Sequence, residues 1–247
     1  MDSTIITPHI SRRYNQDLEN IFNKVLAMGG SVEEQVSRAF ECVRTSEENL
    51  EKEVISMARF NNSQQAVLHE MCVRLLARQQ PAAIDLRLII AALHIVTNLE
   101  RIGDETTKLA KAVINLRALD TVNCCHVPGY QNLVEMTEYA QEMLKITLDA
   151  FAHLDVRKAM SLLPKEAAAD KAYSNAKALI RDYMMQEPSK IPSMLEILQA
   201  LRGMERVTDH SLNIAEYVFY VVEGQEMRQI STDRLHELSQ KYQDTTE

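Results

Sequence analysis

The chain contains an internal repeat, and this repeat constrains its fold more than any other feature. Shifting residues 93–113 by 105 positions places them on residues 198–218, with six identities. The identical pairs are Leu93 and Leu198, Glu100 and Glu205, Arg101 and Arg206, Asp104 and Asp209, Ala110 and Ala215, and Val113 and Val218. Self-similarity at a fixed spacing is the signature of duplicated structural units. We therefore expect two copies of one unit of about 110 residues.

The units are predicted to be helical. Only six glycines and six prolines occur in 247 residues, and 46% of the residues are hydrophobic. Apolar residues recur at helical spacing along nearly the whole chain, which predicts amphipathic helices. The expected fold class is all-α, with six long helices arranged as two tandem three-helix bundles.

The first repeat is predicted to span residues 1–120. Its first helix carries Leu18 to Val43, and Gly29-Gly30 within it predicts a kink or a close contact with another helix. Thr45 and Glu48 fit a capping box that would start the second helix. That helix has an apolar stripe through Leu50, Val54, Val67, Met71 and Leu75 and ends before Pro81. The third helix has its stripe through Leu86, Ile89, Ile90, Leu93, Val96 and Val113.

A linker at 121–130 is expected to lead into the second repeat at 131–224. The fourth helix runs from about Leu133 to Leu154, and Asp155 is the expected N-cap of a fifth helix that Pro164 bends. The sixth runs from Met194 to Val222 and stops at Gly224. A polar tail at 225–247 is expected to contain one short helix around Leu235.

Charge and cysteine content exclude several classes of protein. The net charge of −8 disfavours a nucleic-acid binder, which needs a basic face. The apolar runs are much shorter than the roughly 20 residues that span a bilayer, and no export signal is evident at the N-terminus. Four cysteines predict a reduced, cytoplasmic setting. Cys124-Cys125-His126 lacks a second ligand pair at the spacing of a zinc site.

Three carboxylate pairs stand four residues apart: Glu100 with Asp104, Glu205 with Asp209, and Glu166 with Asp170. Such pairs lie on one helix face and repel each other unless a cation neutralises them. Oxygen-preferring cations suit this chemistry. Since the fifth helix should lie beside the sixth, Glu166 and Asp170 are expected to face Glu205 and Asp209. Four carboxylates would then converge on one or more ions.

The first repeat has a simpler alternative. Lys108 follows Asp104 by four residues, so Glu100, Asp104 and Lys108 could form a solvated charge ladder beside Arg101. The facing residues of the second helix are expected to be Ala58 or Arg59 and Asn62 or Ser63, none of them acidic. In the second repeat Asn213 replaces the lysine.

Catalysis is not expected. A carboxylate-bridged di-iron bundle needs Glu-x-x-His motifs, and no Glu of this chain has His three residues later. The seven histidines are scattered, and no glycine-rich phosphate loop follows a strand.

Several motifs together resemble the PhoU family. They are His9-Ile10-Ser11, Tyr14 to Glu19, Ala27 to Gly30 with Val32-Glu33, Cys72 to Arg74, Arg78 to Pro81, Asp85 to Arg87, the two Glu-Arg-x-x-Asp segments, and Asn213 to Val218. The resemblance extends to about Gln229.

The resemblance implies a six-helix adaptor rather than an enzyme. PhoU proteins couple the ATPase subunit of a phosphate ABC transporter to a sensor histidine kinase at the membrane. They are negative regulators of phosphate uptake and of starvation signalling. It also implies a homodimer, membrane contact through partners alone, and iron, zinc, manganese or magnesium at Glu100, Asp104, Glu166, Asp170, Glu205 and Asp209. Two alternatives stay open: a metal-binding or metal-storing bundle without transporter coupling, and a structural dimerisation module.

Overall fold

The computed structural model describes residues 12–45, 49–119 and 126–230, together with Arg234, Leu238 and Tyr242. Throughout these residues the secondary structure is helical, with turns but no strand, which confirms the all-α prediction. The elements are α1 (Arg12–Arg44), α2 (Leu50–Gln79), α3 (Ala83–Leu119), α4 (Tyr130–His153), α5 (Val156–Met160), α6 (Leu162–Gln186) and α7 (Ile191–Glu223), with the short 3₁₀ helices η2 (Pro188–Lys190) and η3 (Met227–Gln229).

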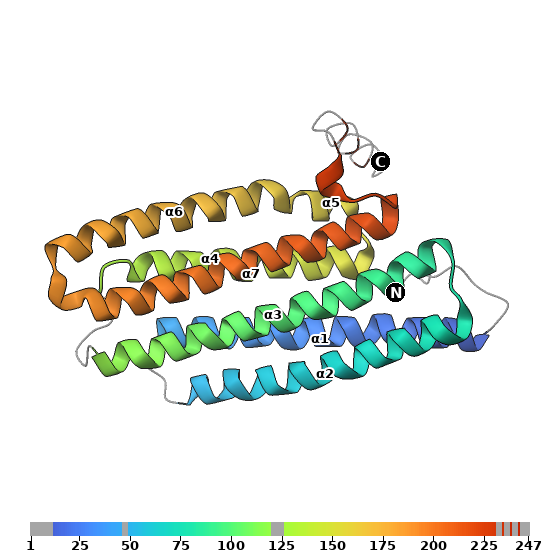
Figure 1. Ribbon diagram of the computed structural model, residues 1–247, viewed down its shortest axis with the longest axis horizontal. Helices are drawn as coiled ribbons and strands as arrows, with labels where there is room; N and C mark the ends of the chain where they lie inside the picture. Colours follow the sequence, from blue (N-terminus) through green and yellow to red (C-terminus); the bar gives the residue numbers. More distant parts are fainter. Residues whose placement is uncertain are drawn as a thin grey trace.

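The six long helices form two three-helix bundles that lie side by side (Figure 1). One bundle contains α1, α2 and α3, and the other contains α4, α6 and α7. The bundles meet along two seams, α3 against α7 on the near face of Figure 1 and α1 against α4 behind it. Helices α2 and α6 lie at the outer edges.

Helices α3 and α7 cross antiparallel. Arg87 near the start of α3 donates to the carbonyl of Val221 at 3.0 Å, and Asn115 near its end donates to Glu196 at 3.1 Å. Because each residue of α3 is equivalent to one 105 positions later in α7, this crossing relates the repeats by an approximate twofold axis. The axis passes near Ile102 and Val207, which are both fully buried.

The hydrophobic core runs through both bundles and across both seams. Phe151 of α4 and Phe219 of α7 are its largest fully buried side chains. Gly29 of α1 marks a close contact, as expected, because a Cβ there would lie 2.6 Å from Cδ2 of Leu148 on α4. Helix α1 is continuous through this glycine pair, so the close approach of two helices explains Gly29.

Several predicted helix ends agree with the structure. Asp155 caps α5 by accepting a hydrogen bond from the backbone N–H of Lys158 at 3.0 Å. Gly224 ends α7 in the left-handed conformation with φ 72°, where glycine avoids the steric penalty of a side chain. Pro188 begins η2, which leads into α7, and Pro192 lies in the first turn of α7.

Two predicted ends were wrong. Thr45 does not cap α2; its hydroxyl donates to the carbonyl of Glu41 at 2.9 Å, and Asn49 with φ 84° precedes the helix. The predicted fifth helix is also split at Ser161 into α5 and α6. The reason is Pro164, whose ring cannot be accommodated beside the carbonyl of the residue four earlier, Met160, at which α5 ends.

The predicted stripes also extended too far. Val67 and Leu86 were assigned to apolar stripes but are 45% and 36% exposed. Three further expectations fall on residues outside the described ranges. They are the capping partner Glu48, the thiol pair Cys124-Cys125 and the short tail helix around Leu235.

Candidate functional site: a carboxylate cluster between α6 and α7

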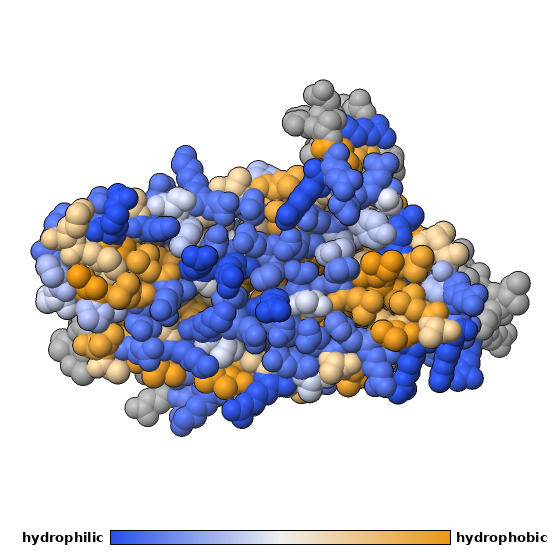
Figure 2. Space-filling model, viewed as in Figure 1, coloured by the Kyte–Doolittle hydropathy of each residue, from blue (hydrophilic) through white to orange (hydrophobic). Residues whose placement is uncertain are grey.

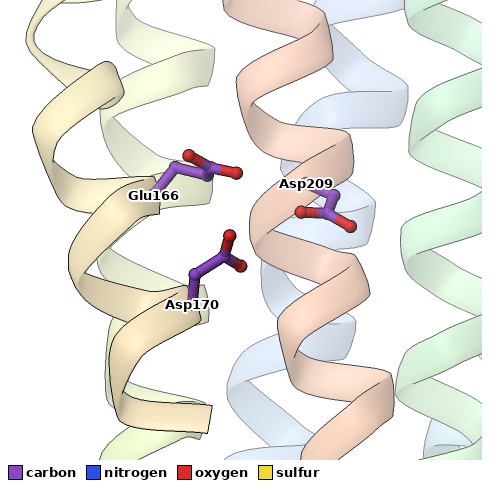
Figure 3. A group of neighbouring side chains, drawn as sticks. All are labelled: Glu166, Asp170 and Asp209. Atoms are coloured by element: carbon purple, nitrogen blue, oxygen red, sulfur yellow. The ribbon is translucent and has the colours of Figure 1, made fainter. Parts of the chain in front are cut away.

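One group of potential metal ligands stands out in the described part of the chain. Donor atoms of Glu166, Asp170 and Asp209 all lie within 4.8 Å of one another. Glu166 and Asp170 project from successive turns of α6, and Asp209 faces them from α7 (Figure 3). Within residues 12–45, 49–119 and 126–230, no other set of three acidic, histidine or cysteine side chains meets this criterion.

The packing of α6 on α7 brings these side chains together. Both helices contribute buried apolar residues to the core, among them Ala169 and Ala176 of α6 and Val207 and Ile214 of α7. Helix α6 packs against α7. The half-buried Glu166 and Asp209 and the exposed Asp170 therefore meet at the rim of this contact.

Electrostatics at the cluster disfavours the fully ionised state. Burial, followed by the neighbouring Asp170 and Asp209 carboxylates, raises the pKa of Glu166. Burial and Asp170 likewise raise the pKa of Asp209. The same effects act on Glu205, which lies one turn before Asp209: burial, Asp209 and Asp170 raise its pKa. A cation bound among these oxygens would relieve both desolvation and repulsion.

Arg228 supplies positive charge beside the cluster, a role that the sequence analysis missed. Its Nε donates to Glu216 at 2.5 Å and its Nη2 donates to Asn213 at 2.8 Å. The positive charge of Arg228 opposes the rise in pKa of both Glu166 and Asp209. One signal was available: Asn213 and Glu216 stand where the first repeat has Lys108 and Lys111.

The first repeat has a carboxylate pair on α3, but the residues of α2 that were expected to face this pair are not acidic. Burial and Asp104 raise the pKa of Glu100, and Arg101 lies 3.6 Å from it. On α2, Arg59, Asn62 and Ser63 are exposed and Ala58 is buried. The structure therefore brings Glu166, Asp170 and Asp209 together but adds no third ligand to Glu100 and Asp104 among the residues it describes.

The expected charge ladder of the first repeat is different in detail. Lys108 does not pair with Asp104 but donates to Glu105 at 2.8 Å. Glu105 is buried at the α3–α7 seam and also accepts a hydrogen bond from Arg206 of the other repeat at 2.9 Å. The lysine was misassigned because a helical residue can reach back three positions as readily as four.

A neutral amide network joins the three helices of the first bundle. The buried Gln35 of α1 donates to the carbonyl of Gly103 on α3 at 2.9 Å and accepts from Asn61 of α2 at 2.9 Å. Asn61 in turn accepts from the hydroxyl of Ser31 at 2.7 Å. Gly103 must be small here, because a Cβ would lie 2.9 Å from the Gln35 side-chain oxygen.

Fold and site together define a class: two-repeat, three-helix-bundle proteins with carboxylates on the second and third helices of a repeat. A family model described as the PhoU domain matches the chain twice, at residues 25–113 and 133–218. The chain belongs to the PhoU family.

Curated relatives match nearly end to end. The phosphate-specific transport system accessory protein PhoU homolog of Pseudomonas aeruginosa is 39% identical over 233 residues, 94% of each chain. The phosphate-specific transport system accessory protein PhoU of Escherichia coli K12 is 35% identical over 238 residues, 96% of this chain and 97% of that one.

Solved structures agree with the fold. The crystal structure of PhoU from Pseudomonas aeruginosa superposes with a TM-score of 0.81, at 39% identity, over 86% of this chain and all of that one. The phosphate transport system regulatory protein PhoU from Streptococcus pneumoniae gives a TM-score of 0.75, at 26% identity, over 87% of this chain and 99% of its own. Among the described helices of our chain, none has the length and apolarity to cross a membrane.

Proposed function

We propose that this protein is a cytoplasmic accessory regulator of phosphate transport, which restrains phosphate uptake and starvation signalling when phosphate is plentiful. The observation that supports this most is the match of both repeats to the PhoU domain, together with relatives named for phosphate-specific transport that are 35% and 39% identical over nearly the whole chain. An adaptor role requires binding surfaces rather than a catalytic centre.

The proposed partners are the ATPase subunit of the phosphate ABC transporter and a sensor histidine kinase, with the protein acting as a homodimer. The net charge of −8 would favour partners with basic docking surfaces, since complementary charge speeds association and selects partners. Contact with the membrane would come through these partners alone.

The proposal includes a cation at the carboxylate cluster. Glu166, Asp170 and Asp209 offer only oxygen ligands, with Glu205 one turn away. Such ligands suit magnesium and manganese, and iron or zinc can also use carboxylates. The burial and crowding that raise the pKa of three of these groups fit a site completed by a positive ion. Glu100 and Asp104 remain a predicted second site that would need ligands beyond those described.

Gene deletion tests the regulatory role. Cells that lack the protein should express phosphate-scavenging genes at high phosphate, and the wild-type gene should restore repression. Unchanged expression after deletion would reject the role. A pull-down from cells grown with and without phosphate would then identify the transporter and kinase contacts.

Thermal unfolding with Mn²⁺ tests the cation site. A ligand at 100 times its Kd stabilises the folded state by about 2.7 kcal/mol. For a chain of this length that raises Tm by roughly 5–11 °C. The double variant Glu205→Gln, Asp209→Asn should lose this increase. The matched variant Glu100→Gln, Asp104→Asn, at the equivalent positions of the first repeat, should retain it.

The same variants separate the regulator from a metal-holding bundle, the second candidate function, which the carboxylate cluster favours. If Glu205→Gln, Asp209→Asn abolishes stoichiometric metal while repression persists, the ion is not central to regulation. If metal and repression disappear together, the two functions belong to one site.

A further inference from the structure

The chain after α7 folds back toward the carboxylate cluster. Gly224 ends the helix, and its N–H donates to the carbonyl of Tyr220 at 2.9 Å. The following segment, residues 225–230, includes η3 and turns toward α6 (Figure 1). Met227 anchors it, because this side chain is only 2% exposed. Arg228 is thereby held against the face of α7 that carries Asp209.

Spacing along α7 explains why Arg228 affects the cluster. Asp209, Asn213 and Glu216 follow one another at intervals of four and three residues, so they share one face of the helix. Arg228 binds the last two. Its charge therefore lies within one or two helical turns of Asp209, in a site where Glu166 also faces α7 (Figure 3).

The two repeats carry different residues at the equivalent positions that follow the acidic pair. In the first repeat, Lys108 and Lys111 belong to α3 itself, in the two turns that follow Asp104. In the second, the equivalent residues are Asn213 and Glu216, which are hydrogen-bond acceptors for Arg228. In the second repeat, the segment 225–230 therefore brings positive charge to this face of α7 through Arg228, in addition to the charge of Arg206 on the helix itself.

We propose that Arg228 is a tethered counter-ion that sets the cation affinity of the Glu166–Asp170–Asp209 cluster, so that cation binding and docking of segment 225–230 oppose each other. Glu216 attracts Arg228 most strongly, and the charges of Glu166 and Asp209 add to this attraction. A divalent ion bound at the cluster would neutralise Glu166 and Asp209 and repel the guanidinium of Arg228. Coupling between two binding events is reciprocal, so docked Arg228 weakens cation binding by the same factor by which the bound cation weakens docking. This inference rests on the cation site of the proposed function.

Release of the segment would change a second surface. Met227 and Arg228 form one wall of a cavity of about 480 Å³ whose other walls include His94 of α3 and Tyr217 of α7. The rings of His94 and Tyr217 are stacked 4.5 Å apart across the seam between the repeats. Figure 2 shows that polar residues cover the middle of this face and that apolar surface gathers toward its ends. Loading of the cluster would therefore uncover part of the α3–α7 face.

Isothermal titration of the full chain with Mn²⁺ at low salt tests the coupling. Arg228→Gln should bind Mn²⁺ about five- to tenfold more tightly than the wild type, a factor at the lower end of typical couplings between sites. Arg181→Gln is the matched control, because Arg181 is exposed on α6 and pairs only with its neighbour Asp182 among the contacts of the described residues. Its affinity should equal that of the wild type.

Hydrogen exchange gives an independent readout of the segment. In the wild type, saturating Mn²⁺ should speed amide exchange of residues 226–230, whereas in Glu205→Gln, Asp209→Asn it should have no effect. If the wild type binds Mn²⁺ but Arg228→Gln changes its affinity less than twofold and exchange at 226–230 stays constant, the counter-ion role is overturned while the cation site stands. If the wild type does not bind Mn²⁺, the cation site itself is rejected, and the coupling with it.

Discussion

The amide network of the first bundle gives a prediction whose size follows from its geometry. Gln35 and Asn61 are both fully buried, and each depends on the other for one hydrogen bond. In Asn61→Ala the side-chain oxygen of Gln35 loses its donor in the interior. A buried polar atom left unsatisfied costs about 1–3 kcal/mol. We expect a loss of about 2 kcal/mol, which for a chain of this length lowers Tm by roughly 4–8 °C.

A double-mutant cycle tests the reasoning more strictly than one variant. Gln35→Met has a similar shape without the amide, and it should cost a similar amount because the Asn61 amide loses its acceptor. In the double variant neither orphan remains, since the carbonyl of Gly103 keeps its hydrogen bond from Thr107 at 3.0 Å. The combined loss should therefore fall at least about 1 kcal/mol short of the sum.

Thermal and urea unfolding followed by circular dichroism would measure each term. Ser63→Ala is the control on the same helix, because its exposed hydroxyl bonds only the carbonyl of Phe60 within α2; it should change stability by less than about 0.5 kcal/mol. Losses that add within 0.5 kcal/mol, or a Tm decrease below about 1 °C in Asn61→Ala, would show that the network does not stabilise the fold as argued.

Three further predictions concern the second repeat and the thiols. Gly224→Ala should lower stability by about 1–2 kcal/mol in urea unfolding, because its φ of 72° is strained for any residue with a Cβ; an unchanged midpoint would contradict this. In the metal-free protein, the raised pKa values of Glu166, Glu205 and Asp209 mean that the folded state binds protons more tightly than the unfolded state. Their contribution to stability should therefore become more favourable as pH falls from above the folded pKa values toward the unfolded value of about 4; Asp209→Asn should weaken this slope, and an equal slope would refute it. The last prediction uses the double variant Cys124→Ser, Cys125→Ser. Its remaining thiols, Cys42 and Cys72, are buried, and burial raises the pKa of each to about 11. They should react with a thiol reagent only on unfolding, and rapid reaction in the native protein would be inconsistent with their burial.

Much of the fold could be predicted because its determinants are local and periodic. Helical spacing identified the long helices. The start of α5 and the end of α7 could be predicted from single residues, because the Asp155 side chain accepts a capping hydrogen bond and Gly224 adopts the left-handed conformation. Thr45 misled because the hydroxyl that fits an N-cap can also bond back to the preceding turn. The break at Ser161 was missed because the sequence places Pro164 but does not say whether the helix bends or stops.

The candidate site was predictable only as far as helix neighbours were. Spacing within a helix paired Glu166 with Asp170 and Glu205 with Asp209, and the expected contact of their helices brought the pairs together. Arg228 was beyond that reasoning, because its position depends on the direction of the chain after Gly224 and on the burial of Met227. Lys108 was assigned to the wrong carboxylate because Glu105, three residues earlier, is as close to it along the helix as Asp104, four residues earlier; the contact of Glu105 with Arg206 of the other repeat is tertiary and could not be predicted from spacing.

The near-twofold crossing of α3 and α7 affects the orientation in which another protein can bind. A molecule with exact twofold symmetry presents two identical surfaces related by a 180° rotation, so a single partner could bind in either of two orientations. Here the second repeat has the cluster of Glu166, Asp170 and Asp209, whereas the first repeat has lysines after its acidic pair and the amides Gln35 and Asn61 between its helices. Because the charge differs between the two repeats, the two binding orientations are not equivalent, and a charged partner would favour one of them.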